Sequence, residues 1–242
     1  MSDTKLRPFK ITRHFMKNAE GSCLVEMGNT KVICSASVNE QVPHWMKNAG
    51  MGWVTAEYAM LPRSTHERKP RESRVGRLDS RSVEISRIIG RALRGVVDLR
   101  KLNGFTIVID CDVLEADGGT RTASINGGFS ALYDAITFLL EKKLIKENPI
   151  KEFIGAVSVG KVGKRYVVDL SYEEDSRAEV DLNITMTESG KIIDIQGTGE
   201  RSGFTRQELN DMLDLAEKAI MEIINYQKKN LLGEHLNKML KK

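Results

Sequence analysis

Two glycines followed by a threonine and an arginine, from Gly118 to Arg121, are well suited to holding an anion. Glycines allow backbone conformations in which several N–H groups converge on one point, and a helix beginning just after them adds N–H donors and a partial positive charge. The hydroxyl of Thr120 and the guanidinium of Arg121 match phosphate oxygens. The segment lacks the Gly-Lys-Ser/Thr ending of a P-loop. A purely structural alternative stays open, in which the glycines form a tight turn, Thr120 caps the helix and Arg121 pairs with Asp117.

A run of carboxylates is the second candidate for chemistry, with five acidic residues between Tyr172 and Asp181. Carboxylates this dense between apolar strands repel one another unless a cation offsets them, and Mg²⁺ binds through one or two carboxylates plus substrate phosphates. On a straight strand Asp175 and Asp181 would lie roughly 20 Å apart, so a shared site requires the chain to turn over 176–178. A solvated acidic loop is the alternative. The four histidines show no shared pattern that would supply a base.

Positive charge is concentrated between Arg63 and Arg94, where ten Lys or Arg residues stand against four Asp or Glu, although the whole chain carries only +4. A local positive stretch on a nearly neutral body indicates a local anionic partner. The alternative is a solvated charged face.

The elements that would position these residues follow from the spacing of apolar side chains. Alternation predicts strands, helical spacing predicts helices, and the polar, basic stretch 62–80 is predicted to be a mobile loop. In the first half we expect strands over 22–27, 31–38, 52–58 and 105–113, an arginine-faced helix with an apolar stripe from Ile85 to Val96, and a helix over 124–143.

The second half repeats this style. Strands are expected over 155–162, 166–172, 180–187 and 191–196, followed by a long helix that starts with a capping box at Thr205 and Glu208. Each half is therefore expected to run strands first and then a helix. That order favours an α+β fold of two similar halves over a doubly wound parallel sheet.

The composition is that of a soluble globular protein, with 40% hydrophobic and 29% charged residues among 242. No apolar run is long enough for a membrane span, and the N-terminus is not typical of a secretory signal. Cys23, Cys34 and Cys111 are odd in number and lie among apolar residues. They predict reduced, buried thiols in a cytosolic protein, with neither a zinc site nor a disulfide framework.

Several segments match a known family in order and spacing. They are Leu6-Arg7-Pro8, 19–22, 52–58, 60–63, 109–113, 116–125, 172–176, 178–181, 196–198 and the closing helix. Together they resemble the ribonuclease PH family of phosphorolytic exoribonucleases from about Leu6 to about Asn230. The resemblance implies an α+β fold of two similar βαβα-type halves, like ribosomal protein S5 domain 2. The expected domains are 6–145 and 150–230, with a tail over 231–242 to which we assign no role.

The resemblance also implies a reaction. Inorganic phosphate, the co-substrate, attacks the 3′-terminal phosphodiester of RNA, chiefly tRNA precursors, and releases a nucleoside diphosphate. The expected phosphate ligands are Arg81, Gly119, Thr120 and Arg121. Asp175 and Asp181 match the catalytic aspartates, which hold Mg²⁺ (or Mn²⁺) or manage proton transfer. The residues expected to contact RNA are Arg63, Arg68, Arg71, Arg74 and Arg77. The resemblance further implies a cytoplasmic homohexamer, a trimer of dimers without membrane attachment.

The match has departures that leave alternatives open. The family's Asp-Gly-Arg run before Leu-Arg-Pro is reduced to residues 2–5, which puts contacts of this arm in doubt. Segments 65–69 and 81–86 lean toward the active subunit of archaeal exosomes, so a ring subunit that needs a partner chain is a second hypothesis. A non-catalytic RNA-binding subunit and a metal-dependent hydrolytic nuclease are the others. In every case that involves phosphate contacts, RNA binding should depend on salt and discriminate little between sequences.

Overall fold

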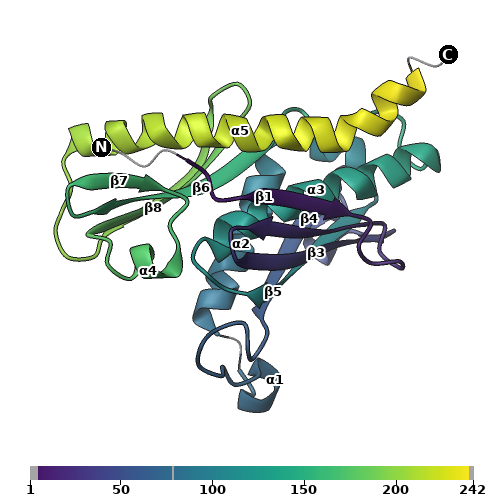
Figure 1. Cartoon of the computed structure of the whole chain (residues 1–242). Coiled ribbons are helices and arrows are strands. Elements are labelled where there is room, and N and C mark those ends of the chain that lie inside the picture. Colours follow the sequence, from purple (N-terminus) through teal and green to yellow (C-terminus); the bar gives the residue numbers. More distant parts are fainter. Residues whose placement is uncertain (1–4, 78, 240–242) are drawn as a thin grey trace.

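Two separate β-sheets carry the fold of this chain, whose computed structural model describes residues 5–77 and 79–239 (Figure 1). The first sheet has the strand order β1-β2-β3-β5-β4 and the second has the order β7-β6-β8-β9. Residues 2–4 of the expected N-terminal arm, Leu78 of the expected loop and residues 240–242 of the expected tail lie outside the described residues.

The first sheet confirms the predicted strands and adds one. Its strands are β1 (Phe9–Arg13), β2 (Gly21–Met27), β3 (Thr30–Asn39), β4 (Trp53–Met60) and β5 (Thr106–Glu115). The short strand β1 was not predicted. Cys23, Cys34 and Cys111 are register neighbours across β2, β3 and β5, and all three are buried free thiols, as expected.

Strand β4 runs parallel to β5, whereas the other pairs of this sheet are antiparallel. The cause is helix α2 (Ser80–Gly95), which carries the chain back so that β5 enters in the same direction as β4. Helix α2 lies between β4 and β5, where the arginine-faced helix was predicted, so the first half is not a simple order of strands followed by one helix.

Helix α3 (Thr120–Glu141) lies between the two sheets and is buried nearly all round through Ile136, not along one stripe. It packs against β2, β3 and β5 of the first sheet and against β6 (Ile154–Val162) of the second. The side chain of Asn126 joins the halves, because its Nδ2 donates to the Ala156 carbonyl oxygen at 2.9 Å and its Oδ1 accepts from the Ala156 N–H at 2.8 Å. Strand β7 does not reach that part of β6, so Asn126 satisfies backbone groups that a strand would otherwise pair.

The second sheet is antiparallel throughout and differs from expectation at one element. Strand β7 (Arg165–Val168) ends earlier than predicted, and the residues from Tyr172 to Asp175 form the short helix α4. Strands β8 (Val180–Thr187) and β9 (Ile192–Gly199) lie where they were expected.

The closing helix α5 (Arg206–Met239) runs along both sheets (Figure 1). The predicted capping box is present, because the Glu208 N–H donates to the Thr205 hydroxyl and the Glu208 carboxylate accepts from the Thr205 N–H. Farther along, α5 closes the free edge of β1. The Tyr226 hydroxyl accepts from the Ile11 N–H, and the Asn230 amide donates to the Ile11 carbonyl.

The predicted basic loop between β4 and α2 contains one short helix, α1 (Glu72–Val75). This loop projects away from the body formed by the sheets and α5 (Figure 1). Among residues 5–77 and 79–239, no helix combines the length and apolar character that a membrane crossing would need.

Candidate active site

The segment from Asp117 to Arg121 connects β5 to α3, and both of its glycines have left-handed backbone conformations. Gly118 has φ 75° and Gly119 has φ 64°, and the helix begins directly afterwards at Thr120, earlier than predicted. An L side chain adopts these angles only at a cost, which explains the two glycines. The Thr120 hydroxyl lies 2.9 Å from the hydroxyl of buried Tyr58, which lies beneath the loop.

The side chain of Asp117 is used to shape this loop. One carboxylate oxygen accepts from the Tyr172 N–H at 3.0 Å, and the other accepts from the Asn29 amide at 3.0 Å. The Thr30 hydroxyl accepts from the Asp117 N–H and donates to the Gly118 carbonyl oxygen. Among the described residues Arg121 forms no ion pair with Asp117, and its guanidinium donates instead to Gln196 Oε1 on β9. The turn in which Arg121 pairs with Asp117 is therefore not the one observed.

Gly118 also lies unusually close to the second half of the chain. A Cβ atom placed on it would overlap the carbonyl oxygen of Leu170, which is backbone and cannot move aside as a flexible side chain would. The missing side chain is thus what lets the loop and the segment before α4 touch.

Arg7 is a residue of this site to which the sequence assigned no role. Its Nη2 lies 2.6 Å from Oδ1 of buried Asp169, and its Nη1 donates to the Asp117 carbonyl oxygen at 2.5 Å. One guanidinium therefore connects the loop to the segment that precedes α4. The available signal was the Leu6-Arg7-Pro8 match, which names the position but not its partners.

The two aspartates are brought together by the predicted turn. Asp175 ends α4, and the Arg177 and Ala178 N–H groups donate to the carbonyl oxygens of Glu174 and Asp175 before β8 begins. Asp181 then lies on β8. The extended arrangement, which would have kept the two carboxylates apart, is excluded.

Asp181 is a half-buried carboxylate with an incomplete set of partners. Its Oδ2 accepts from the Asn183 amide at 3.0 Å, while its Oδ1 has no hydrogen-bond partner among the described residues. Burial, and next the charge of Asp175, raise the pKa of Asp181 to about 6. Burial also raises the pKa of Asp175, against the opposing effect of the Arg81 charge.

No group of three or more His, Cys, Asp or Glu suited to a metal occurs in the described residues. Two carboxylates with one free buried oxygen nevertheless fit Mg²⁺ or Mn²⁺, which complete their shells with phosphate and water.

One cleft of about 1140 Å³ brings these groups together. It is lined from the first half by Arg81, Gly119, Thr120 and Arg121, and from the second by Asp175 and Asp181. Every residue predicted to bind phosphate or to act in catalysis therefore faces one space.

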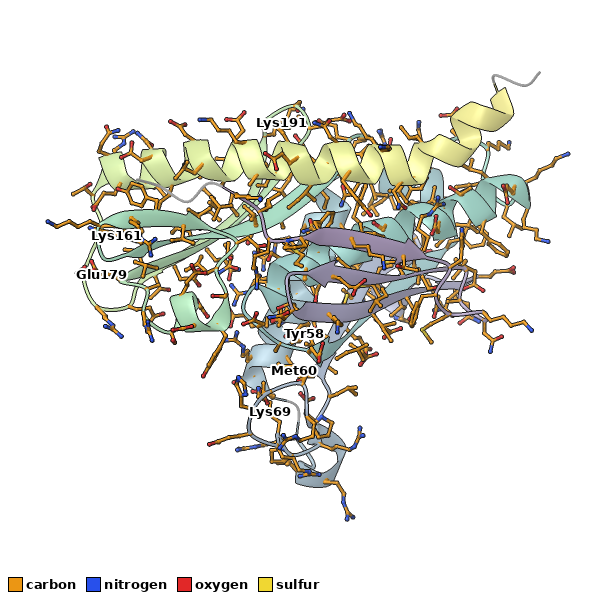
Figure 2. The ribbon with its side chains drawn as sticks, in the orientation of Figure 1. Tyr58, Met60, Lys69, Lys161, Glu179 and Lys191 are labelled. Atoms are coloured by element: carbon orange, nitrogen blue, oxygen red, sulfur yellow. The ribbon has the colours of Figure 1, made fainter. Side chains whose placement is uncertain are left out.

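The predicted RNA-contacting arginines divide into two groups. Arg68 lines the cleft, whereas Arg63, Arg71, Arg74 and Arg77 do not. All five are exposed, and none has an ion-pair partner among the residues that the structure describes. Figure 2 shows Tyr58 and Met60 on the sheet side and Lys69 within the projecting loop, where its ammonium lies 3.6 Å from the Met60 sulfur.

Comparison with family models decides the classification. Residues 5–137 match the model described as "3' exoribonuclease family, domain 1", and residues 152–219 match "3' exoribonuclease family, domain 2". The chain belongs to the 3′ exoribonuclease family. The two matched segments contain the loop after β5 and the aspartates of α4 and β8, respectively.

Solved structures show the same two-domain α+β fold as this member of the 3′ exoribonuclease family. A chain of the Archaeoglobus fulgidus exosome, with RNA bound to the active site, has a TM-score of 0.78 at 23% identity and covers 91% of this chain and 88% of its own. Rrp46 of rice (Oryza sativa) has a TM-score of 0.77 at 16% identity, with coverage of 96% and 98%. An archaeal exosome core chain has 0.71 at 22%, with coverage of 94% and 87%.

The close approach at Gly118 predicts an unequal effect of two glycine substitutions. Gly104 has φ 88° and open space where a Cβ would lie, so Gly104→Ala should cost about 1–2 kcal/mol of unfolding free energy through its backbone conformation alone. Gly118→Ala, at φ 75°, should cost about 2 kcal/mol more because the methyl group overlaps the Leu170 carbonyl. Urea unfolding measures both. Equal losses would show that the close approach carries no energy.

The raised pKa of Asp181 predicts a pH-dependent stability cost. Because the folded-state pKa of about 6 exceeds the ordinary value of 3.8, the folded chain holds this proton more tightly than the unfolded chain. The carboxyl therefore lowers stability progressively as the pH rises from about 4 through 6. With EDTA present, Asp181→Asn should be about 1–3 kcal/mol more stable than wild type at pH 8, with the difference shrinking toward pH 4. Exposed Asp214→Asn is the control and should show no such trend. A constant difference across pH would contradict the assignment.

Proposed function

We propose that this chain is a phosphate-dependent 3′-to-5′ exoribonuclease that removes nucleotides from the 3′ end of RNA, tRNA precursors among them, and releases nucleoside diphosphates. The observation that carries the proposal is the single cleft that joins an anion-binding loop to the carboxylates of exposed Asp175 and half-buried Asp181. A hydrolytic nuclease has no use for a second anion site beside its carboxylates, whereas phosphorolysis needs a place for the attacking phosphate.

Inorganic phosphate arrives as an anion, so its attack on the terminal phosphodiester needs positioning and charge neutralisation more than a strong base. Arg121 and the N-terminus of α3 supply donors on one side of the cleft, and Arg81 of α2 supplies a second guanidinium. The new bond joins a phosphate oxygen to the scissile phosphorus, and the bond to the 3′ oxygen of the shortened RNA breaks.

Asp175 and Asp181 are the residues that would hold Mg²⁺ or Mn²⁺, which when bound would neutralise charge on the scissile phosphate and the leaving 3′ oxygen. Their raised pKa values also suit a carboxyl that delivers a proton to that oxygen. Asn183 donates to one Asp181 oxygen and so keeps the other turned away from it.

The exposed arginines of the basic loop fit a polyanion that enters past α1 toward the cleft. Contacts of this kind read the phosphate backbone and not the bases, so we expect salt-dependent binding of many RNAs. We place the activity in the cytoplasm, where three free buried thiols would stay reduced.

The likeness to exosome chains favours a second candidate, a ring subunit that becomes active only beside a partner chain. The first candidate works as a homohexamer. Light scattering of the pure protein, together with its activity, separates the two: an active assembly of six identical chains supports the first, and an inactive smaller species supports the second.

The identity of the product tests the proposal itself. A 3′-labelled RNA incubated with the pure chain, Mg²⁺ and inorganic phosphate should yield nucleoside diphosphates, and omitting phosphate should stop their formation. Thin-layer chromatography against mono- and diphosphate standards provides the measurement. Monophosphates formed without phosphate would show a hydrolytic nuclease instead, and RNA binding without any product would show a non-catalytic subunit.

Two substitutions should separate phosphate use from turnover. Arg121→Ala should raise the KM for phosphate about 10- to 100-fold by removing a charged donor, with a small effect on RNA binding. Asp181→Ala should lower kcat at least about 100-fold while RNA affinity changes less. Exposed Arg100, which pairs with Asp98 outside the cleft, supplies the matched control Arg100→Ala. Ordinary phosphate dependence in Arg121→Ala, or near-normal turnover in Asp181→Ala, would count against the roles assigned to these residues.

A further inference from the structure

Two aromatic rings at the cleft have no part in the reaction as described so far. Tyr172 and His66 both line the cleft, and their ring centroids lie 6.0 Å apart with the planes tilted by 55°. Tyr172 is 56% exposed, although the cleft that it lines also contains half-buried Asp181. An aromatic ring held open beside a charged site offers an apolar face to something flat.

The backbone of Tyr172 is fixed relative to the reaction centre. It is the first residue of α4, and Asp175 is the last, so the two side chains are neighbours at helical i, i+3 spacing, roughly 5–6 Å between Cβ atoms. The Tyr172 N–H donates to Asp117, which shapes the phosphate loop. The Tyr172 ring therefore lies close to the Asp175 carboxylate, and short hydrogen-bonded segments fix their relative positions.

His66 approaches from the other side, on the basic loop. It lies between Arg63 and Arg68, so the aromatic pair bridges the segment predicted to follow the RNA backbone and the helix that ends in Asp175. The two rings are tilted relative to each other, so the histidine packs beside the tyrosine ring and leaves much of that ring exposed.

We propose that Tyr172 is a stacking platform for a nucleobase within the last two nucleotides of the RNA, and that His66 positions its ring. The inference rests on the proposed function and names how the RNA end is held. Stacking suits an enzyme that must accept every base in turn, because every base presents a π-face whatever its hydrogen-bonding edge. The arginines neutralise the backbone, while the platform places the terminal base and with it the scissile phosphate.

The test compares an intact RNA with RNAs that lack bases. One oligonucleotide carries abasic sites at its last two positions, and a second carries two abasic sites far from the 3′ end. Binding is measured by fluorescence anisotropy without phosphate, so that it does not depend on turnover. Wild type should bind the intact RNA roughly 5- to 100-fold more tightly than the end-abasic RNA, and the internally abasic RNA nearly as well as the intact one.

Substitutions then assign this discrimination to the tyrosine. Tyr172→Ala should bind intact and end-abasic RNA equally, whereas Tyr172→Phe, which keeps the ring, should behave as wild type. Phe15→Ala is the matched control, because Phe15 is a 47% exposed aromatic that does not line the cleft. If Tyr172→Ala still discriminates fully between intact and end-abasic RNA, or if Tyr172→Phe no longer does, the proposed stacking role of Tyr172 is wrong.

The role of His66 has its own readout. His66→Ala should lose part of the discrimination, and adding it to Tyr172→Ala should cause no further loss, because histidine acts through the tyrosine ring. An independent further loss in the double variant would show that His66 meets the RNA on its own.

Kinetics separate failure of this inference from failure of the proposed function. In the phosphorolysis assay Tyr172→Ala should raise the KM for RNA while leaving the KM for phosphate unchanged. If wild type forms no diphosphates yet still distinguishes intact from end-abasic RNA in the anisotropy assay, the proposed activity fails and the platform stands. If diphosphates form and no variant alters the discrimination, the platform fails and the activity stands.

Discussion

The close contact between the loop at Gly118 and the segment that leads into α4 is the constraint on which the site depends. The phosphate loop belongs to the first sheet and the aspartates belong to the second, so neither half contains a site. Only a glycine lets the loop backbone reach the Leu170 carbonyl. Arg7 then forms an ion pair with buried Asp169 across the same junction, and the Asp117 carboxylate accepts from the Tyr172 N–H. The packing of the two halves against each other therefore sets the geometry of the cleft.

Much of this arrangement could be predicted from the sequence, because its signals are local. Alternation and helical spacing identified most strands and helices, and the acidic run required a turn that the structure contains. The parts that were missed depend on distant partners. Strand β1 is short and is completed by β2 and by side chains of α5, while β7 gives way to α4 because a Ser171 capping box begins a helix there. Arg7 acts on residues more than a hundred positions away, which no local pattern records.

The carboxylate pair illustrates how function and stability oppose each other in this fold. A carboxylate whose buried oxygen has no hydrogen-bond partner costs folding free energy, since the charged form is poorly solvated. The surrounding structure tolerates that cost because Asp181 lies on β8, an interior strand paired on both sides, and its position does not depend on its own hydrogen bonds. A group whose place is set by the sheet is free to bind something else.

Helix α4 fixes the proposed binding position of the RNA end relative to the carboxylates in a similar way. It is only one turn long, too short to be stable by itself, and its N-terminal end is fixed by the Ser171 capping box and by the Asp117 contact to Tyr172. Since Tyr172 and Asp175 occupy its two ends, any shift of the helix moves the exposed ring and the carboxylate together. A base resting on that ring would thus be placed relative to the catalytic group by a single rigid turn. The phosphate loop supports that turn through Asp117, so the sites for phosphate, RNA end and carboxylates share one junction.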